Sequence, residues 1–378
     1  MFAENGSEAL NIVQKEPVDV VISDMRMPGM DGAELLEKVM KISPLTARFV
    51  LSGQYDKEAT LRSVGPVHQY FSKPCDIRQI KDNINHALKL RNCISGNDIT
   101  ELISRIETLP SIPQVYLEIV AELRKDEPDV SRITGLIEAD LGFATKILQI
   151  VNSSFFGIPN HISDIRQAVT FLGLDVIRAL VLYVKLFREF KSQVLPADLL
   201  NNLMSHSLSV AKYARIIAQS CKYTRTEEEN LFTAACFHDV GKLIFFAYLP
   251  DKYQETVAYI REHHCTEAEA EKAVIGVTHA EVGAYLLCLW GLKDEIVEAI
   301  LYHHQPSLSV QAGTVILPLL HIADHMFYEI NPDRKPAQEC VSVPDRNYLA
   351  GVGMANRLSE WLTLLIMKEG TQNHGWAV

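Results

Sequence analysis

The chain has 378 residues, 48% of them hydrophobic and 22% charged, which suits two or three globular domains with buried cores. Its net charge is −11 and no cluster of lysine and arginine stands out, so we expect no binding to nucleic acid or to an anionic membrane surface. No apolar run predicts a membrane span, and the N-terminus lacks a secretory signal pattern. The seven cysteines contain no C-x-x-C pair, which indicates reduced thiols and a cytoplasmic location.

Three short apolar runs in the first ninety residues predict strands of a buried parallel sheet. The runs cover residues 18–23, 48–52 and 69–72, and helical patterns lie at 32–40 and 77–90. The alternation of strand and helix predicts a doubly wound α/β sheet. In such sheets the functional residues lie beyond the carboxyl ends of the strands. In this sequence a polar residue ends or directly follows each predicted strand.

The residues at these strand ends are Asp24, Ser52 and Lys73. Asp24-Met-Arg-Met-Pro-Gly-Met-Asp-Gly32, Leu51-Ser-Gly53 and Tyr70-Phe-Ser-Lys73-Pro74 together resemble the receiver domain of response regulators. The resemblance implies that Asp24 is the phosphoacceptor and that a sensor histidine kinase is the partner. Ser52, Tyr70 and Lys73 would be the switch residues, because a hydroxyl and an ammonium group can be recruited by the new phosphoryl oxygens.

The sequence departs from the receiver pattern at its start. A receiver normally opens with a strand that ends in paired acidic residues, which bind Mg²⁺, whereas residues 1–6 resemble the end of the second receiver strand. We therefore expect residues 1–92 to form a receiver that lacks its first strand and helix, either because the true start lies upstream or because the domain is a remnant. Without the acidic pair, Mg²⁺ would lose most of its carboxylate ligands, and phosphorylation of Asp24 would be poor.

Almost all of the chain after a polar junction near Gly96 predicts helices. We expect an all-α domain followed by closing helices. Their bounds are residues 99–330, with an N-terminal bundle at 99–195 and a second helical subdomain at 196–330, and then residues 331–378. Phe155, Phe156 and Ile158 lie in an apolar loop and suit either a protein-contact surface or the core.

Three segments of this helical region carry a second resemblance. They are Leu109-Pro-Ser-Ile-Pro113, Ile147-Leu-Gln-Ile-Val-Asn-Ser-Ser-Phe-Phe-Gly157 and Ala168-Val-Thr-Phe-Leu-Gly173, and they resemble the HDOD family. The resemblance covers roughly residues 102–324. HDOD domains are relatives of HD-type phosphohydrolases that occur in bacterial signalling proteins, so the resemblance implies a helical output module.

Seven histidine and aspartate residues of the second half suit metal ligands, because imidazole and carboxylate together bind Zn, Fe or Mn. They are His206, His238, Asp239, His279, His303, His304 and Asp324. In metal-dependent HD phosphohydrolases the ligands come in the order His, His-Asp, Asp, and the matching residues here are His206, His238, Asp239 and Asp324. The remaining three match the extra positions of relatives that bind two metals and cleave cyclic dinucleotides. We expect a bound divalent metal, with His279 and one of His303 or His304 completing a second position.

Two neighbours of these candidate ligands, Lys242 and Glu281, also have predicted roles. Lys242 follows the His238-Asp239 pair on one helix face, and it would either neutralise a phosphate or pair with Asp239. Thr278 and Glu281 predict a capping box, which places His279 in the first turn of a helix and explains Glu281 without a catalytic role.

Two functions stay open on the sequence alone. In the first, the HDOD module of a response regulator acts through contact with a signalling protein and holds its metal without catalysis. In the second, the chain is a metal-dependent phosphohydrolase acting on a nucleotide or cyclic dinucleotide. The full ligand set favours the hydrolase. Gln305 stands where the cyclic-dinucleotide hydrolases carry Glu, and the sequence has no Gly-Tyr-Pro loop, so we expect no appreciable cleavage of cyclic dinucleotides.

Overall fold

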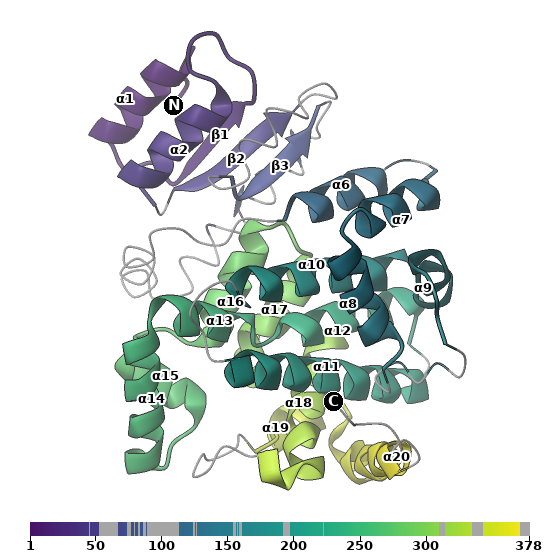
Figure 1. The fold of residues 1–378 in the computed structure, drawn as a ribbon. Helices are drawn as coiled ribbons and strands as arrows, with labels where there is room; N and C mark the ends of the chain where they lie inside the picture. The colour runs from purple at the N-terminus through teal and green to yellow at the C-terminus, as the bar shows by residue number, and fades with distance from the viewer. Residues whose placement is uncertain are drawn as a thin grey trace. The chain divides into compact units, whose positions relative to one another are not determined.

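A computed structural model of the chain describes residues 1–44, 46–52, 67–73, 77–78, 80–81, 84–85, 88, 113–123, 125, 127–153, 156, 158, 161–191, 197–221, 223–309, 314–334 and 343–370. The chain divides into two compact units. One contains residues 1–129 and 285–292, and the other contains residues 130–284 and 293–378. Described residues of the first unit include a small parallel sheet, and those of the second are helical (Figure 1).

The sheet has three parallel strands in the order β1 (Val20–Asp24), β2 (Ala47–Ser52) and β3 (Gln69–Ser72). Asp24 is in register with Leu51, and Ser52 with Ser72, so the carboxyl ends of the three strands meet at one end of the sheet. All three predicted strands are confirmed, each within two residues of its expected bounds.

Two capped helices pack on this sheet. Helix α1 (Gly6–Lys15) begins where the side chain of Asn5 accepts a hydrogen bond from the backbone of Glu8, and residues 1–5 form no strand. Helix α2 (Gly32–Ile42) has Asp31 as its N-cap and lies between α1 and strands β1 and β2. Leu36 of α2 is buried in the core cluster of the sheet, and Leu35 is buried in a second cluster that includes Val13 of α1.

The helix predicted over residues 77–90 falls largely on residues outside those described. The described positions among them are helical, namely 77–78, 80–81, 84–85 and 88. The remaining helices are α6 (Gln114–Leu123), α7 (Val130–Glu138), α8 (Leu141–Val151), α9 (Ile165–Leu172), α10 (Leu174–Lys191), α11 (Ala197–Cys221), α12 (Arg225–Phe237), α13 (Val240–Tyr248), α14 (Pro250–His263), α15 (Glu267–Val274), α16 (His279–Leu289), α17 (Asp294–Tyr302), α18 (Ile316–Ile330), α19 (Arg346–Gly351) and α20 (Leu358–Gly370).

Helices α11, α12, α17 and α18 pack against one another at the centre of the second unit. Every residue of α12 from Asn230 to Phe237 is buried, which is the pattern of a helix enclosed on all sides. The stretch Arg225–Tyr248 is long and apolar enough to cross a membrane by composition, but 89% of its apolar window is buried inside the fold. Packing within the helical core therefore accounts for its apolar character.

The apolar loop near residue 157 contributes to this core through Phe156. Its ring lies 5.9 Å from the ring of Phe232 on α12, centroid to centroid, and the Arg215 guanidinium carbon lies over the ring at 5.7 Å from its centroid. Ile158 is half-buried, and Phe155 lies outside the described residues. For Phe156, these contacts support a role in the core over a role in a protein-contact surface.

A close backbone contact joins α13 to the start of α16. A Cβ atom added at Gly241 would overlap the carbonyl oxygen of His279, and one added at Gly283 would press on Val240. Glycine at these two positions lets the helices approach until Asp239 and His279 are neighbours.

We expect Gly241→Ala to lower the free energy of unfolding by about 1–3 kcal/mol, because the added methyl group must push two packed helices apart. Gly135→Ala is the matched control: it is also helical, and nothing lies within 4 Å of the added atom, so stability should stay the same or rise by about 0.4–1 kcal/mol. Urea denaturation followed by circular dichroism measures both. Equal midpoints for the two variants would show that the contact does not constrain the fold.

Candidate metal centre

All seven predicted ligand side chains come together within the second unit. They reach one place from five segments: α11 supplies His206, the α12–α13 junction supplies His238 and Asp239, α16 supplies His279, the end of α17 supplies His303 and His304, and α18 supplies Asp324. Six of the seven residues are buried, each with at most 8% of its surface exposed, and His304 is half-buried.

Position A is the group formed by His206, His238, Asp239 and Asp324. The Nε2 atom of His206 lies 3.1 Å from Nε2 of His238, 3.3 Å from Oδ2 of Asp239 and 3.2 Å from Oδ1 of Asp324. Nε2 of His238 lies 3.5 Å from the same Asp239 oxygen and 3.7 Å from Oδ1 of Asp324. His206, His238 and Asp239 offer ligand atoms within 4.8 Å of one another. Asp324 adds a carboxylate oxygen near both histidines, so the group offers four candidate ligands to a divalent metal.

Position B is the group formed by Asp239, His279, His303 and His304. Nε2 of His279 lies 3.1 Å from Oδ1 of Asp239 and 3.1 Å from Nε2 of His304. Nε2 of His303 lies 3.9 Å from Oδ1 of Asp239, and all four residues offer ligand atoms within 4.8 Å of one another. The sequence predicted one of His303 and His304 here, and the structure brings both rings into the group.

Asp239 belongs to both positions through different oxygens. Its Oδ2 atom faces position A and its Oδ1 atom faces position B. The residue sits between two helices: His238 ends α12 in a helical conformation, and Asp239 itself has φ −99° and ψ 11° before α13 begins. The two oxygens of Asp239 would therefore offer one ligand atom to each position.

At His279, burial is outweighed by the charge of Glu271, which raises the pKa of that ring to about 10. Burial keeps three other histidines, His238, His303 and His304, in the neutral form that metal binding needs. It lowers the pKa of His238 and holds that of His303 well below its ordinary value. For His304, burial and the neighbouring His279 lower the pKa to about 3. Neutral rings keep a lone pair available at the nitrogen that faces the site.

The two aspartates are held ionised. Burial by itself would raise the pKa of Asp239, but the Lys242 ammonium and the adjacent histidines outweigh it and lower that pKa well below its ordinary value. For Asp324, burial is likewise outweighed by the hydrogen bond and charge of His206, which lower the pKa. Ionised carboxylates and neutral imidazoles are the protonation states of metal ligands.

Several buried polar atoms of these ligands lack hydrogen-bond partners among the described residues. They are Nδ1 of His206, Oδ1 of Asp239 and Nε2 of His303. Leaving a buried polar atom unpaired costs about 1–3 kcal/mol, and two of these three atoms face position B. A divalent cation at position B would satisfy both, so the residues present fit a metal.

Lys242 pairs with two carboxylates on the wall of the site. Its Nζ atom lies 3.0 Å from Oδ2 of Asp239 and 2.7 Å from Oε2 of Glu267 on α15. Of its two predicted roles, the structure shows the pairing with Asp239, and contact with a phosphate stays a prediction. Sequence reasoning did not include Glu267, because 25 residues separate it from Lys242 and no motif links them.

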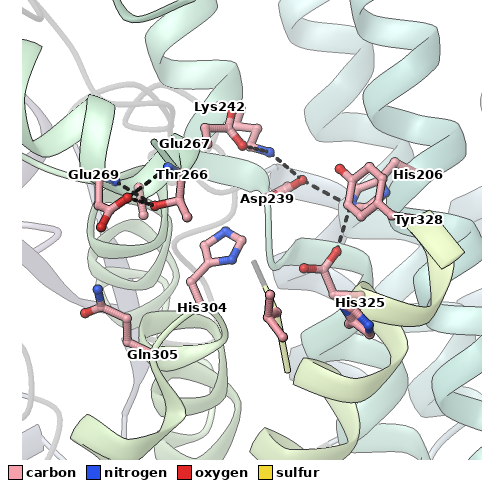
Figure 2. A pocket seen from close by; sticks show the side chains of 13 residues that line it. His206, Asp239, Lys242, Thr266, Glu267, Glu269, His304, Gln305, His325 and Tyr328 are labelled. Atoms are coloured by element: carbon pink, nitrogen blue, oxygen red, sulfur yellow. Dashed lines mark hydrogen bonds and ion pairs between the residues drawn. The ribbon is translucent and has the colours of Figure 1, made fainter. Parts of the chain in front are cut away.

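A cavity opens onto the ligand groups. Its volume is about 230 Å³, and its lining includes His206, Asp239, His304 and Asp324. Lys242, Tyr328 and Gln305 line it as well, and Figure 2 shows them around the same space. That volume is below the roughly 300–1,000 Å³ of drug-sized ligand sites. Because the lining includes residues of both ligand groups, the cavity gives a small molecule access to both metal positions.

The predicted receiver site is placed in part. Nζ of Lys73 lies 2.6 Å from Oδ1 of Asp24, and both side chains are nearly half exposed. Ser52 ends β2 and Tyr70 lies within β3, while their side chains fall outside the described part of the structure. The Asp24–Lys73 pair sits where the strands end, as an acceptor carboxylate and its lysine partner would.

The fold and these two sites define the class: a parallel α/β receiver domain joined to a helical domain of HD type. The family model of the response regulator receiver domain matches residues 1–85, and that of the HDOD domain matches residues 109–306. The chain belongs to the HDOD family and carries a receiver domain, which makes it a signal transduction regulator.

Individual relatives agree with this assignment. The chain is 38% identical over 93 residues to sporulation initiation phosphotransferase F of Bacillus subtilis (strain 168), which covers 24% of this chain and 73% of that protein. It is 25% identical over 203 residues to an uncharacterized protein of Treponema pallidum (strain Nichols), 54% of this chain but only 39% of that relative's length. A crystal structure of an HDOD domain protein of unknown function from Geobacter sulfurreducens shares the fold, with a TM-score of 0.57, 22% identity and coverage of 77% and 95% of the two chains.

We expect Lys242→Met to destabilise the metal-free protein by about 3–5 kcal/mol, because it leaves buried carboxylates without their cation. Lys252→Met is the control: Lys252 also pairs with a glutamate three residues away, but 36% and 55% of the two side chains are exposed, so the change should cost about 0–1 kcal/mol. Urea denaturation in the presence of a chelator measures the difference. A loss at Lys242 no larger than that at Lys252 would contradict the buried charge balance.

Proposed function

We propose that this chain is a cytoplasmic response regulator whose HDOD domain holds two divalent metals and signals through contact with another protein. A sensor histidine kinase would phosphorylate Asp24, and the helical domain would be the output. The observation that carries the metal proposal is the pair of ligand groups that share Asp239, one on each of its oxygens.

The donor sets indicate the class of metal. Position A offers two imidazoles and two carboxylates, and position B offers three imidazoles and the shared carboxylate. Mixed nitrogen and oxygen ligands of this kind suit Fe, Mn or Zn. Metal binding would also stabilise the fold, because the ligands come from separate helices and the binding free energy adds to the folding free energy.

Output through contact is supported by the residues after the histidine pair. Gln305 lines the cavity beside His304 and is a neutral, weaker ligand than the Glu found in cyclic-dinucleotide hydrolases. The sequence also lacks the Gly-Tyr-Pro loop of those enzymes. A substrate misplaced by about 1 Å can react about 10²-fold more slowly, so the loss of a positioning loop weighs against turnover.

A metal-dependent phosphohydrolase is the second candidate, and the open cavity favours it. When bound, the metals would supply Lewis-acid chemistry to a phosphoryl group and its attacking water. Lys242 lines the cavity next to Asp239 and would contribute positive charge to an incoming phosphate. The substrate would be a nucleotide or a cyclic dinucleotide.

We expect the purified protein to contain close to two equivalents of transition metal and to hydrolyse neither cyclic dinucleotides nor nucleotides detectably. Asp324→Asn should remove the metal of position A alone, because Asp324 faces only that group. Asp239→Asn should remove both metals, because its carboxylate is shared. Elemental analysis after desalting without chelator gives the stoichiometry, and the same preparations serve for the hydrolysis screen.

Two results would change this assignment. Near-zero metal in the native protein would contradict the metal proposal. Metal-dependent phosphoester cleavage that disappears in Asp239→Asn would make the hydrolase the better function.

The receiver is tested separately. With acetyl phosphate and Mg²⁺ we expect slow, substoichiometric labelling of this chain, because the sequence offers no acidic pair to bind Mg²⁺ beside Asp24. Asp24→Asn should abolish the labelling, and Asp31→Asn, at the N-cap of α2, should not. Stoichiometric labelling would contradict the Mg²⁺ expectation, and labelling that persists in Asp24→Asn would refute Asp24 as the acceptor.

A further inference from the structure

One buried carboxylate beside the metal centre is not among the predicted ligands. Glu271 lies on α15 and is fully buried. Both of its oxygens lie 2.8 Å from Nδ1 of His279, and its Oε2 atom also accepts a hydrogen bond from the backbone N–H of His279 at 2.8 Å. The carboxylate therefore holds both the ring and the backbone of this residue from the side opposite position B.

The other candidate histidines are held differently. Nδ1 of His238 donates to the carbonyl oxygen of Ala235 at 2.8 Å, and Nδ1 of His303 donates to that of Ile300 at 2.7 Å. Among the described residues, Nδ1 of His206 has no hydrogen-bond partner. Of these four rings, His279 is the one with a carboxylate behind it.

This difference has a chemical consequence. An Nδ1–H group that donates to a carboxylate fixes the orientation of the ring, and it makes Nε2 a stronger donor to a metal that displaces the Nε2 proton. Nε2 of His279 is the atom that lies 3.1 Å from Oδ1 of Asp239 and 3.1 Å from Nε2 of His304. The strengthened nitrogen therefore faces position B, and it approaches Asp239 at the oxygen that belongs to that position.

We propose that Glu271 is a positioning residue that makes position B the higher-affinity metal position of the pair. Position B combines three imidazoles with the shared carboxylate, and the ring of His279 is oriented by Glu271 before any metal arrives. Position A has two imidazoles, one of them with an unpaired outer nitrogen. This inference rests on the proposed metal binding and adds an order of filling: B before A.

The test uses Co²⁺ as the probe, with affinity measured by competition against a chromogenic chelator and coordination followed by visible absorption. Native protein should bind two ions with separable affinities. In the Asp324→Asn background, which leaves position B alone, adding Glu271→Gln should weaken Co²⁺ binding about 10- to 100-fold, the usual effect of losing such a partner. It should also change the absorption bands, because the donor strength of His279 changes. Glu271→Asp, which keeps the charge, should give a smaller loss.

Glu281→Gln is the matched control, because it also removes one negative charge near His279 from a side chain that is half-buried. Glu281 lies two residues from His279, but its carboxylate caps α16 through the backbone N–H of Thr278 and pairs with Lys272. Its substitution should leave Co²⁺ affinity and spectrum unchanged while lowering thermal stability slightly.

The outcomes separate the two proposals. If native protein binds no Co²⁺, both the metal proposal and the role of Glu271 are wrong. If it binds two ions and Glu271→Gln binds with native affinity and spectrum, the metal proposal stands and the role of Glu271 is refuted. An equal loss in Glu281→Gln would likewise refute it, because the effect would then be one of charge or stability alone.

Discussion

The buried carboxylate of Asp239 is the feature around which the helical unit is arranged. One oxygen faces His206 and His238, and the other faces His279. An ionised carboxylate in a protein interior is stable only if cations or hydrogen-bond donors surround it. The helices that supply those partners must therefore pack within a few ångströms of one another, and the glycine at position 241 permits the closest of these approaches.

The charge balance of the site depends on the same residue. Lys242 offsets Asp239 and Glu267 from one side, while Glu271 approaches His279 from the other. Without metal, the site has four carboxylates and one ammonium group in low-dielectric surroundings, and burial by itself would raise the pKa of each carboxylate. Two divalent cations would compensate the remaining negative charge, and this is the physical reason why metal binding and folding are expected to be linked.

The receiver and the helical unit illustrate two ways of building a site. In the receiver, Asp24 and Lys73 become neighbours because parallel strands end together. The backbone topology therefore determines most of the geometry of that site. In the helical unit no single element carries the site. Each ligand stands at a helix end or inside a helix face, and only the packing of five segments brings the atoms within bonding reach of common points.

The features that could be predicted from the sequence are those that depend on interactions between residues close together in the chain. The three strands, the helical character of the second unit and the capping box at Thr278 depend on residues a few positions apart, and local patterning determined them. The seven ligands were identifiable because their order along the chain matches a known pattern.

Tertiary structure alone decided the rest. Glu267 and Glu271 carry no distinguishing sequence signal, since they belong to an alternating acidic stretch that also predicts a solvated surface helix. They enter the site because α15 turns one side toward Lys242 and His279. The sequence also could not predict that Asp239 divides its two oxygens between two positions, or that both His303 and His304 join position B. Both features are set by side-chain directions at helix ends, which depend on how neighbouring helices pack and not on the order of residues along the chain.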